Sequence, residues 1–458
     1  MSLKFGTDGV RGVANADLGI DEVMALGVAT GQWLRAQADR PHALAIGRDS
    51  RRSGPMLKGA FIAGLMAEGI DVTRLGIVPT GCISHAARFG EFGLGAVISA
   101  SHNPAPDNGI KLLGPDGAKI PESTEREISD LWRSELSRAG RKPGTGVGQE
   151  RMAEGQLEAY LDWLMATVPE GLSGMRVAID AAHGAGFFLG VEVFRRLGAE
   201  VMATGTRPDG LNINAEGGAT KPHTIQQLTR ETGADLGIAY DGDADRAVFS
   251  DVQGRLINGD RTIALWSAHW KPNPALVVGT VMSNGGFEAY MRQQGMELIR
   301  ANVGDKYVSA ELVSRGGKIG GEQSGHIIFP EHAPTGDGLL TALQVARVLK
   351  REGRTAADTF GDFENWPQVL INLRLDRKDG YETDPAVMSA MADAQDRLIG
   401  RGRINVRASG TQPVVRVMVE ADEFPLRDQV ATSVVNALLG ARGGHEESRA
   451  DLTYSLGD

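Results

Sequence analysis

The sequence reads Arg176-Val-Ala-Ile-Asp-Ala-Ala-His-Gly-Ala-Gly186 where an apolar strand meets a turn of small and polar residues. The same unit occurs twice more, in Ala43-Leu-Ala-Ile-Gly-Arg-Asp-Ser50 and in Ala275-Leu-Val-Val-Gly-Thr-Val-Met-Ser-Asn-Gly285. Continuous apolar strands of this kind are typical of a sheet whose two faces are both covered by helices. The three units therefore predict three similar α/β domains with mixed sheets.

Helical patterns and spacing support this organisation. Leu57, Phe61 and Leu65 recur at i, i+4 and i+8, which predicts a helix with one apolar face. The three strand-turn units start about 100 to 130 residues apart, the length of one domain each. The C-terminal segment differs, because two alternating stretches, Val369–Leu375 and Val414–Glu420, precede an apolar helix. This pattern predicts a smaller α+β domain.

A chain of 458 residues is longer than one hydrophobic core usually supports. We predict four domains. An α/β domain at 1–155 carries a serine loop, and one at 156–255 carries an aspartate loop. A third α/β domain at 256–366 carries a sugar-binding loop, and an α+β domain at 367–458 binds phosphate.

Composition narrows the class of protein. The chain has 58 acidic and 48 basic residues, a formal net charge of −10, which argues against nucleic acid as its main partner. Cys82 is the single cysteine, so an intramolecular disulfide and a cysteine-rich zinc site are both excluded. The sequence shows neither the apolar core of a signal peptide nor an apolar stretch of about 18 residues. We therefore expect a cytoplasmic protein with no membrane partner.

A serine loop, Ser99-Ala-Ser-His-Asn-Pro104, follows the apolar strand Leu94–Ile98. Such a loop places its hydroxyl groups beyond the carboxyl edge of the sheet, where ligands of α/β proteins bind. The alternative is a polar turn whose side chains bond only nearby backbone. A serine–histidine protease pair does not fit, because adjacent residues of an extended chain point apart and no Gly-x-Ser-x-Gly surrounds Ser101. Lys111 follows downstream and can act as an acid or base, contact a phosphate, or simply be solvated.

An aspartate loop, Asp241-Gly-Asp-Ala-Asp-Arg246, follows the apolar stretch Leu236–Tyr240. Three carboxylates at i, i+2 and i+4 can converge on one hard divalent cation, and without a cation their repulsion would be costly. An EF-hand is excluded, because its glycine at position six and glutamate at position twelve are Arg246 and Val252 here. Three single-oxygen ligands suit Mg²⁺, and the adjacent arginine suits a bridging phosphate. An acidic surface turn is the alternative.

Two further loops carry groups that suit a sugar phosphate. Gly320-Gly-Glu-Gln-Ser-Gly-His326 offers Glu322 and Ser324, which can bond neighbouring sugar hydroxyls, and a histidine that can act as an acid or contact phosphate. A glycine-flanked turn is the alternative there. Arg407-Ala-Ser-Gly-Thr-Gln-Pro413 with Arg416 combines small residues, hydroxyls and two arginines, as an anion cradle requires. A purely structural turn is the alternative to this cradle.

With these four motifs in order, preceded by Phe5-Gly-Thr-Asp-Gly-Val-Arg-Gly12, the sequence resembles the α-D-phosphohexomutase family along essentially its whole length. Within that family it is most similar to the bacterial phosphoglucosamine mutases, a likeness carried by Gln323 and Val303-Gly-Asp-Lys-Tyr307. Two positions depart from the family pattern. Gln412 stands where glutamate is common, which removes a negative charge beside the expected phosphate site, and Ala408 stands where proline is frequent.

The resemblance implies a fold and a reaction. Four domains would surround a central cleft, each contributing one loop. The reaction implied is interconversion of glucosamine 6-phosphate and glucosamine 1-phosphate through a phosphoserine and a 1,6-bisphosphate intermediate, feeding amino-sugar nucleotide and cell-wall precursor synthesis. The partners implied are a phosphorylated hexosamine as substrate and a hexose 1,6-bisphosphate as activator. The sequence is silent on oligomeric state, and a homodimer stays possible.

The resemblance also implies roles for single residues. One Mg²⁺ per chain would be held by Ser101, Asp241, Asp243 and Asp245. The catalytic residues implied are Ser101, Lys111, Arg11, Arg246 and His326. The substrate-binding residues implied are Glu322, Ser324, Arg407, Ser409, Gly410, Thr411 and Arg416.

Other functions stay open at this point. A phosphomannomutase/phosphoglucomutase of other hexose specificity would use the same loops. A non-catalytic sugar-phosphate binding protein would leave Ser101 unphosphorylated or dispensable. A dinucleotide-binding enzyme fits poorly, because Gly190 comes one residue too late after Gly184-Ala-Gly186 for the Gly-x-Gly-x-x-Gly pattern.

Overall fold

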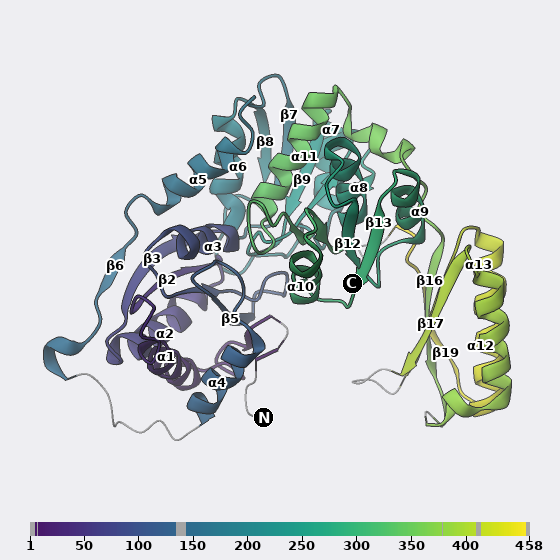
Figure 1. Ribbon diagram of the computed structural model, residues 1–458, viewed down its shortest axis with the longest axis horizontal. Coiled ribbons are helices and arrows are strands. Elements are labelled where there is room, and N and C mark those ends of the chain that lie inside the picture. Colours follow the sequence, from purple (N-terminus) through teal and green to yellow (C-terminus); the bar gives the residue numbers. More distant parts are fainter. Residues whose placement is uncertain (1–4, 7, 134–142, 378, 409–413, 455–458) are drawn as a thin grey trace. The chain divides into compact units, whose positions relative to one another are not determined.

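A computed structural model describes residues 5–6, 8–133, 143–377, 379–408 and 414–454. The chain divides into two compact units, residues 1–281 with 299–359, and residues 282–298 with 360–458. Figure 1 shows the chain as alternating helices and strands, with four separate sheets in sequence order. Within the described part of the chain, no helix combines the length and apolar character that crossing a bilayer requires.

The first sheet has six strands in the order β1-β5-β4-β2-β3-β6. Its strands are β1 (Val10–Val13), β2 (Ala43–Arg48), β3 (Asp71–Ile77), β4 (Leu94–Ile98), β5 (Asp107–Leu113) and β6 (Glu150–Met152). Its helices are α1 (Ile20–Arg35), α2 (Gly54–Ala67), α3 (Thr80–Phe89) and α4 (Glu122–Arg133). Strand β2 runs parallel to β3 and β4, whereas β4, β5 and β1 pair antiparallel. The apolar positions 57, 61 and 65 lie buried on α2, as their spacing predicts.

The second sheet has five strands in the order β11-β10-β9-β7-β8. Its strands are β7 (Arg176–Asp180), β8 (Glu200–Thr204), β9 (Leu236–Tyr240), β10 (Ala247–Ser250) and β11 (Leu256–Ile257), and its helices are α5 (Gln156–Ala166), α6 (Leu189–Arg196) and α7 (His223–Thr232). Every residue of β9 is buried, as expected for a strand covered on both faces. Tyr240 pairs with Ala247 in the antiparallel β9–β10 ladder. The aspartate loop is therefore the connection of a β-hairpin.

The third sheet has four strands in the order β13-β12-β14-β15. Its strands are β12 (Leu276–Thr280), β13 (Glu297–Ala301), β14 (Gly320–Gly321) and β15 (Ile327–Ile328), and the helices in this part of the sequence are α8 (Gly259–Trp270), α9 (Gly285–Gln293), α10 (Asp305–Arg315) and α11 (Gly338–Glu352). Strands β14 and β15 form a short hairpin that encloses residues 322–326. Asp337 caps α11, because its carboxylate accepts from the N–H groups of Leu339 and Leu340.

The C-terminal sheet is entirely antiparallel, in the order β17-β18-β16-β19. It consists of β16 (Gln368–Arg374), β17 (Gly402–Ala408), β18 (Val415–Ala421) and β19 (His445–Asp451), with helices α12 (Pro385–Leu398) and α13 (Phe424–Arg442). Figure 1 shows both helices on one side of this sheet. Valines of β18 pack with α13, for example Val417 and Val419 against Val430 and Val434, in one buried core.

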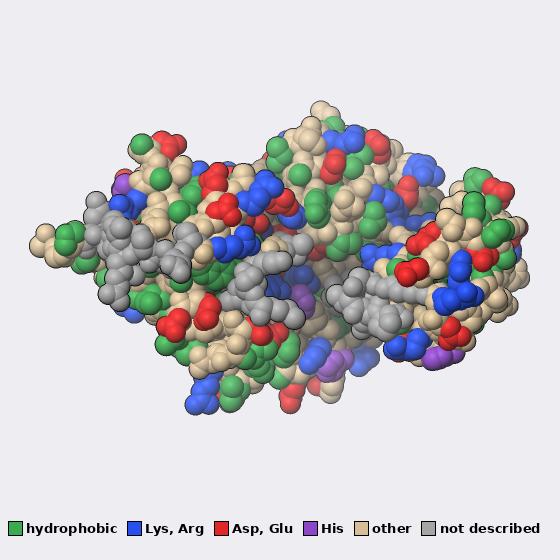
Figure 2. Space-filling view, turned by 90° about the horizontal axis from the view of Figure 1, so that it is seen from below, with side chains coloured by type: hydrophobic (Ala, Val, Ile, Leu, Met, Phe, Trp, Pro, Cys, Tyr) green, Lys and Arg blue, Asp and Glu red, His purple; other side chains and the backbone are tan. Residues whose placement is uncertain are grey.

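Short 3₁₀ turns are at Gly144–Gly146, Ala185–Phe187, Ala356–Gly361 and Tyr381–Thr383. The predicted fold class, three α/β domains with mixed sheets and a smaller C-terminal α+β domain, is confirmed. The domain limits and the central cleft stay predictions. Acidic and basic side chains are interspersed on the face shown in Figure 2. Because the net charge of the chain is negative, an anion has to be bound by local basic groups and backbone N–H groups.

Candidate active site

The serine loop and the aspartate loop meet inside the first unit. The Ser101 hydroxyl donates a hydrogen bond to Asp241 Oδ2 at 2.5 Å. Ser101 is 1% exposed and Asp241 is fully buried. Gly242 makes this approach feasible, because a Cβ atom there would lie 2.4 Å from the Ser101 carbonyl oxygen. Two loops that the sequence identified separately thus form one structural unit.

Ser101 has an unusual backbone. Its φ of +50° lies in the left-handed region, which non-glycine residues adopt only when their surroundings impose it. In this conformation the Ser101 hydroxyl lies 3.4 Å from His102 Nδ1. The expectation that the two side chains point apart is wrong, because it assumed an extended chain.

The three aspartates of the loop are all buried, and one oxygen of each lies within 4.8 Å of the others. Asp243 Oδ1 has no hydrogen-bond partner among the described residues, and the neighbour given for Asp245 Oδ1 is His326 Nδ1, 3.6 Å away and beyond hydrogen-bond distance. Burial and the neighbouring carboxylates of Asp245 and Asp243 raise the pKa of Asp241 well above its usual value. Buried carboxylate oxygens that lack partners are a donor set that fits a hard divalent cation.

Lys111, on β5, supplies the nearest positive charge. Its Nζ lies 2.8 Å from Asp243 Oδ2 and 3.3 Å from Asp245 Oδ2, and it is 2% exposed. Burial alone would lower the pKa of Lys111, but the carboxylates of Asp243, Asp8 and Asp245 outweigh it and hold the pKa well above its usual value. This shift favours the charged form of Lys111, which can donate hydrogen bonds to anionic oxygens.

Asp8 joins the basic residues beside this site. Its carboxylate pairs with Lys111 at 2.9 Å and also contacts Arg11 and Lys119. Burial opposes ionisation of Asp8, yet the three cations lower its pKa. Arg11 lies on β1, which pairs with the strand that carries Lys111. Sequence reasoning assigned Arg11 and Lys111 a role but missed Asp8, although Asp8 is part of the Phe5–Gly12 motif.

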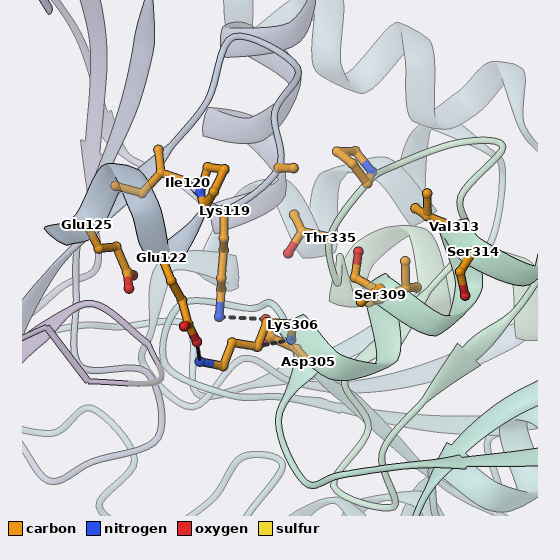
Figure 3. A pocket seen from close by; sticks show the side chains of 15 residues that line it. Lys119, Ile120, Glu122, Glu125, Asp305, Lys306, Ser309, Val313, Ser314 and Thr335 are labelled. Atoms are coloured by element: carbon orange, nitrogen blue, oxygen red, sulfur yellow. Dashed lines mark hydrogen bonds and ion pairs between the residues drawn. The ribbon is translucent and has the colours of Figure 1, made fainter. Parts of the chain in front are cut away.

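A pocket of about 500 Å³ lies between the segment around Lys119 and helix α10. Figure 3 shows Lys119 and Asp305 pointing toward each other, with Nζ and Oδ2 2.5 Å apart. Lys306 pairs with Glu122 at the same pocket. These ion pairs join the first α/β domain to the third within one unit.

His326 stands between the aspartate loop and Asp305. Its Nδ1 lies 3.6 Å from Asp245 Oδ1, and its Nε2 lies 3.5 Å from Asp305 Oδ2. The Gly336 N–H donates to Nε2 at 3.1 Å, so in this arrangement Nδ1 carries the proton toward Asp245. His326 is 3% exposed. The structure thus places three predicted residues, Ser101, Lys111 and His326, around the same carboxylates.

The other predicted site residues of the first unit lie in the loops where the sequence analysis expects them. The Arg246 N–H donates to Asp241 Oδ1 at 3.2 Å, and the residue is half-buried. Glu322 accepts from the Gly304 N–H at 2.9 Å, so its carboxylate is held by the backbone before α10. Ser324 is 6% exposed in the same hairpin turn. The Gln323 side chain between them donates to Asp260 on α8 at 2.8 Å.

The arginines of the C-terminal domain lie opposite each other. Arg407 on β17 is the register partner of Arg416 on β18. Like charges at directly opposed positions of an antiparallel pair are unfavourable unless an anion lies between them. The predicted Ser409, Gly410 and Thr411 lie outside the described residues. The arginine pair alone is consistent with an anion site in this domain.

Thr80 is a further residue that sequence reasoning missed. It begins α3, and its hydroxyl donates to Asp243 Oδ2 at 2.9 Å while its N–H donates to the Asp243 carbonyl at 2.9 Å. Thr80 and Lys111 both donate to Asp243 Oδ2, whereas Asp243 Oδ1 has no hydrogen-bond partner among the described residues. The only local signal is its position directly after β3, where parallel strands present ligand-contacting residues.

Comparison with known proteins places the whole chain in one group. Models of the four domains of phosphoglucomutase/phosphomannomutase match in order. The alpha/beta/alpha domain I matches residues 2–139, domain II residues 158–254, domain III residues 258–365 and the C-terminal domain residues 370–437.

Individual relatives cover nearly the full length. A phosphoglucosamine mutase of Symbiobacterium thermophilum is 44% identical over 444 residues, which is 96% of this chain and 99% of that protein. A phosphoglucosamine mutase of Thermus thermophilus is 46% identical over 421 residues, 92% of this chain and 94% of that protein. Among solved structures, a phosphoglucomutase/phosphomannomutase family protein of Burkholderia thailandensis is similar with a TM-score of 0.80 and 26% identity, covering 96% of this chain and 99% of that one.

Proposed function

This chain belongs to the phosphoglucomutase/phosphomannomutase family, and from that premise we propose that it interconverts glucosamine 6-phosphate and glucosamine 1-phosphate. It is a phosphohexomutase, an isomerase that moves a phosphoryl group within its substrate. The observation that carries the mechanism is the contact between Ser101 and the aspartate loop. The preference for an amino sugar is supported by the relatives from Symbiobacterium thermophilum and Thermus thermophilus, both phosphoglucosamine mutases.

Ser101 acts as the phosphoryl carrier in this proposal. The bond between phosphorus and Ser101 Oγ breaks while a bond forms to the free hydroxyl oxygen of the sugar phosphate. That hydroxyl gives up its proton and Ser101 Oγ takes one up, so the products are a 1,6-bisphosphate and a serine hydroxyl. The sugar then turns over and returns its other phosphoryl group to Ser101. Lys111 donates charge-assisted hydrogen bonds to the transferred oxygens, and Arg11 and Arg246 add positive charge, which stabilises the transition state. His326, with its proton on Nδ1, serves as the acid/base group.

Asp241, Asp243 and Asp245, with an oxygen of phosphorylated Ser101, would hold one Mg²⁺. The carboxylate oxygens without hydrogen-bond partners support this assignment. When bound, the cation would neutralise negative charge that develops on the phosphoryl oxygens. Thr80 and Lys111 meanwhile keep Asp243 oriented through its second oxygen.

Substrate recognition is proposed for the other two loops. Glu322 and Ser324 bond the sugar hydroxyls. The phosphate that is not being transferred binds to the C-terminal anion site, comprising Arg407, Ser409, Gly410, Thr411 and Arg416. The opposed arginines support this role, because an anion between them relieves their repulsion. A hexose 1,6-bisphosphate is proposed as activator, and the homodimer and the cytoplasmic location stay predictions.

Turnover of glucosamine 6-phosphate with and without MgCl₂ tests the proposal, alongside intact-mass measurement of Ser101 phosphorylation. We expect Mg²⁺-dependent turnover, a phosphorylated fraction at Ser101, and loss of activity in Ser101→Ala. Glucose and mannose phosphates serve as competing substrates. Full activity of Ser101→Ala would refute the phosphoserine mechanism, and a preference for unaminated hexoses would refute the substrate assignment while leaving the mechanism in place.

A further inference from the structure

A fully buried arginine lies beneath the serine loop. Arg51, in the segment after β2, is 0% exposed. Its Nη2 donates to the carbonyl oxygens of Ser101 at 2.7 Å and Asn103 at 2.8 Å. Its Nη1 donates to the carbonyl oxygens of Pro104 and Asp107, the latter at 2.9 Å. One side chain therefore holds four main-chain carbonyls of the loop that presents Ser101.

The counter-charge to Arg51 is Asp49, which is also 0% exposed. Arg51 Nε donates to Asp49 Oδ2 at 2.8 Å, and the Ser99 hydroxyl donates to the same oxygen at 2.6 Å. The Ser99 oxygen in turn accepts from the Ser101 N–H at 2.8 Å. Both sides of the Ser101 main chain are thus tied to one buried ion pair, its carbonyl directly and its N–H through Ser99.

This set of contacts uses every donor that an arginine has. A guanidinium offers five N–H groups in a planar fork, and the five acceptors here are one carboxylate oxygen and four carbonyls. Asn214 adds a second donor to the Ser101 carbonyl at 2.9 Å. A lysine carries at most three donors around one nitrogen, so it cannot satisfy the same acceptors.

The hydrogen bonds of Arg51 explain how Ser101 keeps its left-handed backbone. A residue with φ of +50° relaxes toward a common conformation unless its neighbours over-determine it. Any such relaxation turns the Ser101 peptide and moves Oγ away from Asp241, because the side chain follows the main chain. Because Arg51 is fully buried, each of its hydrogen bonds is also expensive to leave unmade.

We propose that Arg51 is a positioning residue for phosphoryl transfer, holding the Ser101 hydroxyl against the aspartate loop. The inference rests on the proposed function, in which Ser101 carries the phosphoryl group. Arg51 touches neither the substrate nor the reacting atoms in this scheme. Its loss therefore affects the chemical step more than the binding of sugar phosphate, whose contacts are assigned to other residues.

The test compares Arg51→Lys with Arg427→Lys in the full-length enzyme. Arg427 is a matched control, because it is a 7% exposed arginine paired with Asp451 at 2.7 Å in the C-terminal domain. We expect kcat of Arg51→Lys to fall by about 10- to 100-fold, the range known for residues that orient reactive groups, with KM for glucosamine 6-phosphate within about twofold. The rate at which a hexose bisphosphate phosphorylates Ser101, followed by intact mass, should fall in parallel. Arg427→Lys should match the wild type in all three.

Chemical rescue separates positioning from general stabilisation. Arg51→Ala leaves a space shaped like a guanidinium ion, so millimolar guanidinium chloride should restore part of kcat in this variant, whereas equal ammonium chloride should not. Wild-type kcat in Arg51→Lys, or an equal fall in Arg427→Lys, would overturn the inference. Two results together would also overturn it: guanidinium fails to restore kcat in Arg51→Ala, and Arg51→Lys gives the circular dichroism spectrum of an unfolded protein. A wild type without turnover would overturn the proposed function, and this inference with it.

Discussion

Ser101 and Asp241 are 140 residues apart in the chain, yet the serine hydroxyl donates to the aspartate at 2.5 Å. The tertiary fold therefore brings the proposed phosphoryl carrier into direct contact with one of the proposed cation ligands. Preorganisation of this kind lowers the reorganisation that the reaction itself requires. It also gives the site measurable properties in the absence of substrate.

Asp241→Asn should stabilise the metal-free protein while abolishing its response to Mg²⁺. Burial and the carboxylates of Asp245 and Asp243 raise the pKa of Asp241, so its charge is unfavourable without a cation. The amide removes that charge and one anionic ligand. We expect the melting temperature in EDTA to equal or exceed that of the wild type. Mg²⁺ at one hundred times its Kd should raise the free energy of unfolding of the wild type by about 2.7 kcal/mol, and this increase should be absent in Asp241→Asn.

Differential scanning fluorimetry with EDTA or excess MgCl₂ measures both effects. Asp39→Asn is the control, because Asp39 is exposed and lies outside the aspartate loop, and it should keep the wild-type response to Mg²⁺. An undiminished Mg²⁺ shift in Asp241→Asn would show that the cation binds elsewhere.

Thr80→Val should weaken Mg²⁺ binding although Thr80 is not a proposed ligand. Its hydroxyl donates to Asp243 Oδ2 at 2.9 Å, and valine keeps the shape while losing the donor. Loss of such an orienting hydrogen bond typically lowers metal affinity by about 10- to 100-fold. Isothermal titration of the metal-free protein gives Kd directly, and Thr80→Ser should restore it.

Thr229→Val is the matched control for this prediction. Thr229 is equally buried, but its hydroxyl donates to the Ile225 carbonyl at 2.6 Å within α7. Equal Mg²⁺ affinities of Thr80→Val and Thr229→Val would mean that Thr80 has no influence on the orientation of Asp243.

Arg416→Gln should raise KM for glucosamine 6-phosphate by about tenfold or more, because a charge-assisted hydrogen bond to phosphate is worth about 1.5–3 kcal/mol. The same change removes the repulsion with the opposed Arg407, a term of about 0.2–1 kcal/mol. Stabilisation of the protein by inorganic phosphate should shrink. Arg401→Gln, an exposed arginine paired with Asp422, should leave KM unchanged. Unaltered KM in Arg416→Gln would remove it from the phosphate site.

Asp337 should give the stability of the protein a defined pH dependence. Burial raises the pKa of Asp337 to about 6, although the N–H groups of Leu340 and Leu339 and the Tyr160 hydroxyl bond its carboxylate. The folded state then binds the proton more tightly than the unfolded state, where the pKa is about 4. Its contribution to stability is complete below pH about 4 and is lost as pH rises through about 6.

Asp337→Asn lacks this titration. The free energy of unfolding of the variant relative to the wild type should therefore increase by up to about 3 kcal/mol between pH about 4 and about 6. Urea unfolding of both proteins across this pH range measures the difference. A difference that stays constant with pH would show that Asp337 titrates alike in the folded and unfolded states.

Much of the fold could be predicted because its signals are local. The continuous apolar stretch Leu236–Tyr240 became a strand buried at every position, and the spacing of Leu57, Phe61 and Leu65 became the buried face of α2. The aspartate loop could be predicted for the same reason, since its carboxylates lie within five consecutive residues. Periodicity and short spacing are properties of neighbouring residues, which the sequence displays directly.

Contacts between distant segments could not be predicted in this way. Thr80 and Asp243 are 163 positions apart, and nothing around either residue indicates the other. The extended chain expected at Ser101 was wrong for the same reason. Ser101 has a left-handed backbone, and its carbonyl oxygen accepts a hydrogen bond from Arg51, 50 positions earlier, a contact that the residues beside Ser101 do not indicate.

The sequence by itself therefore determined the fold class, the family resemblance and the residue types of each loop, because strands, turns and motifs are formed by residues that are neighbours in the chain. Only the tertiary structure decided which loop touches which, which carboxylate oxygens lack hydrogen bonds, and how Ser101 is held. Those properties depend on burial and on hydrogen bonds between strand ends that meet only when the sheets form.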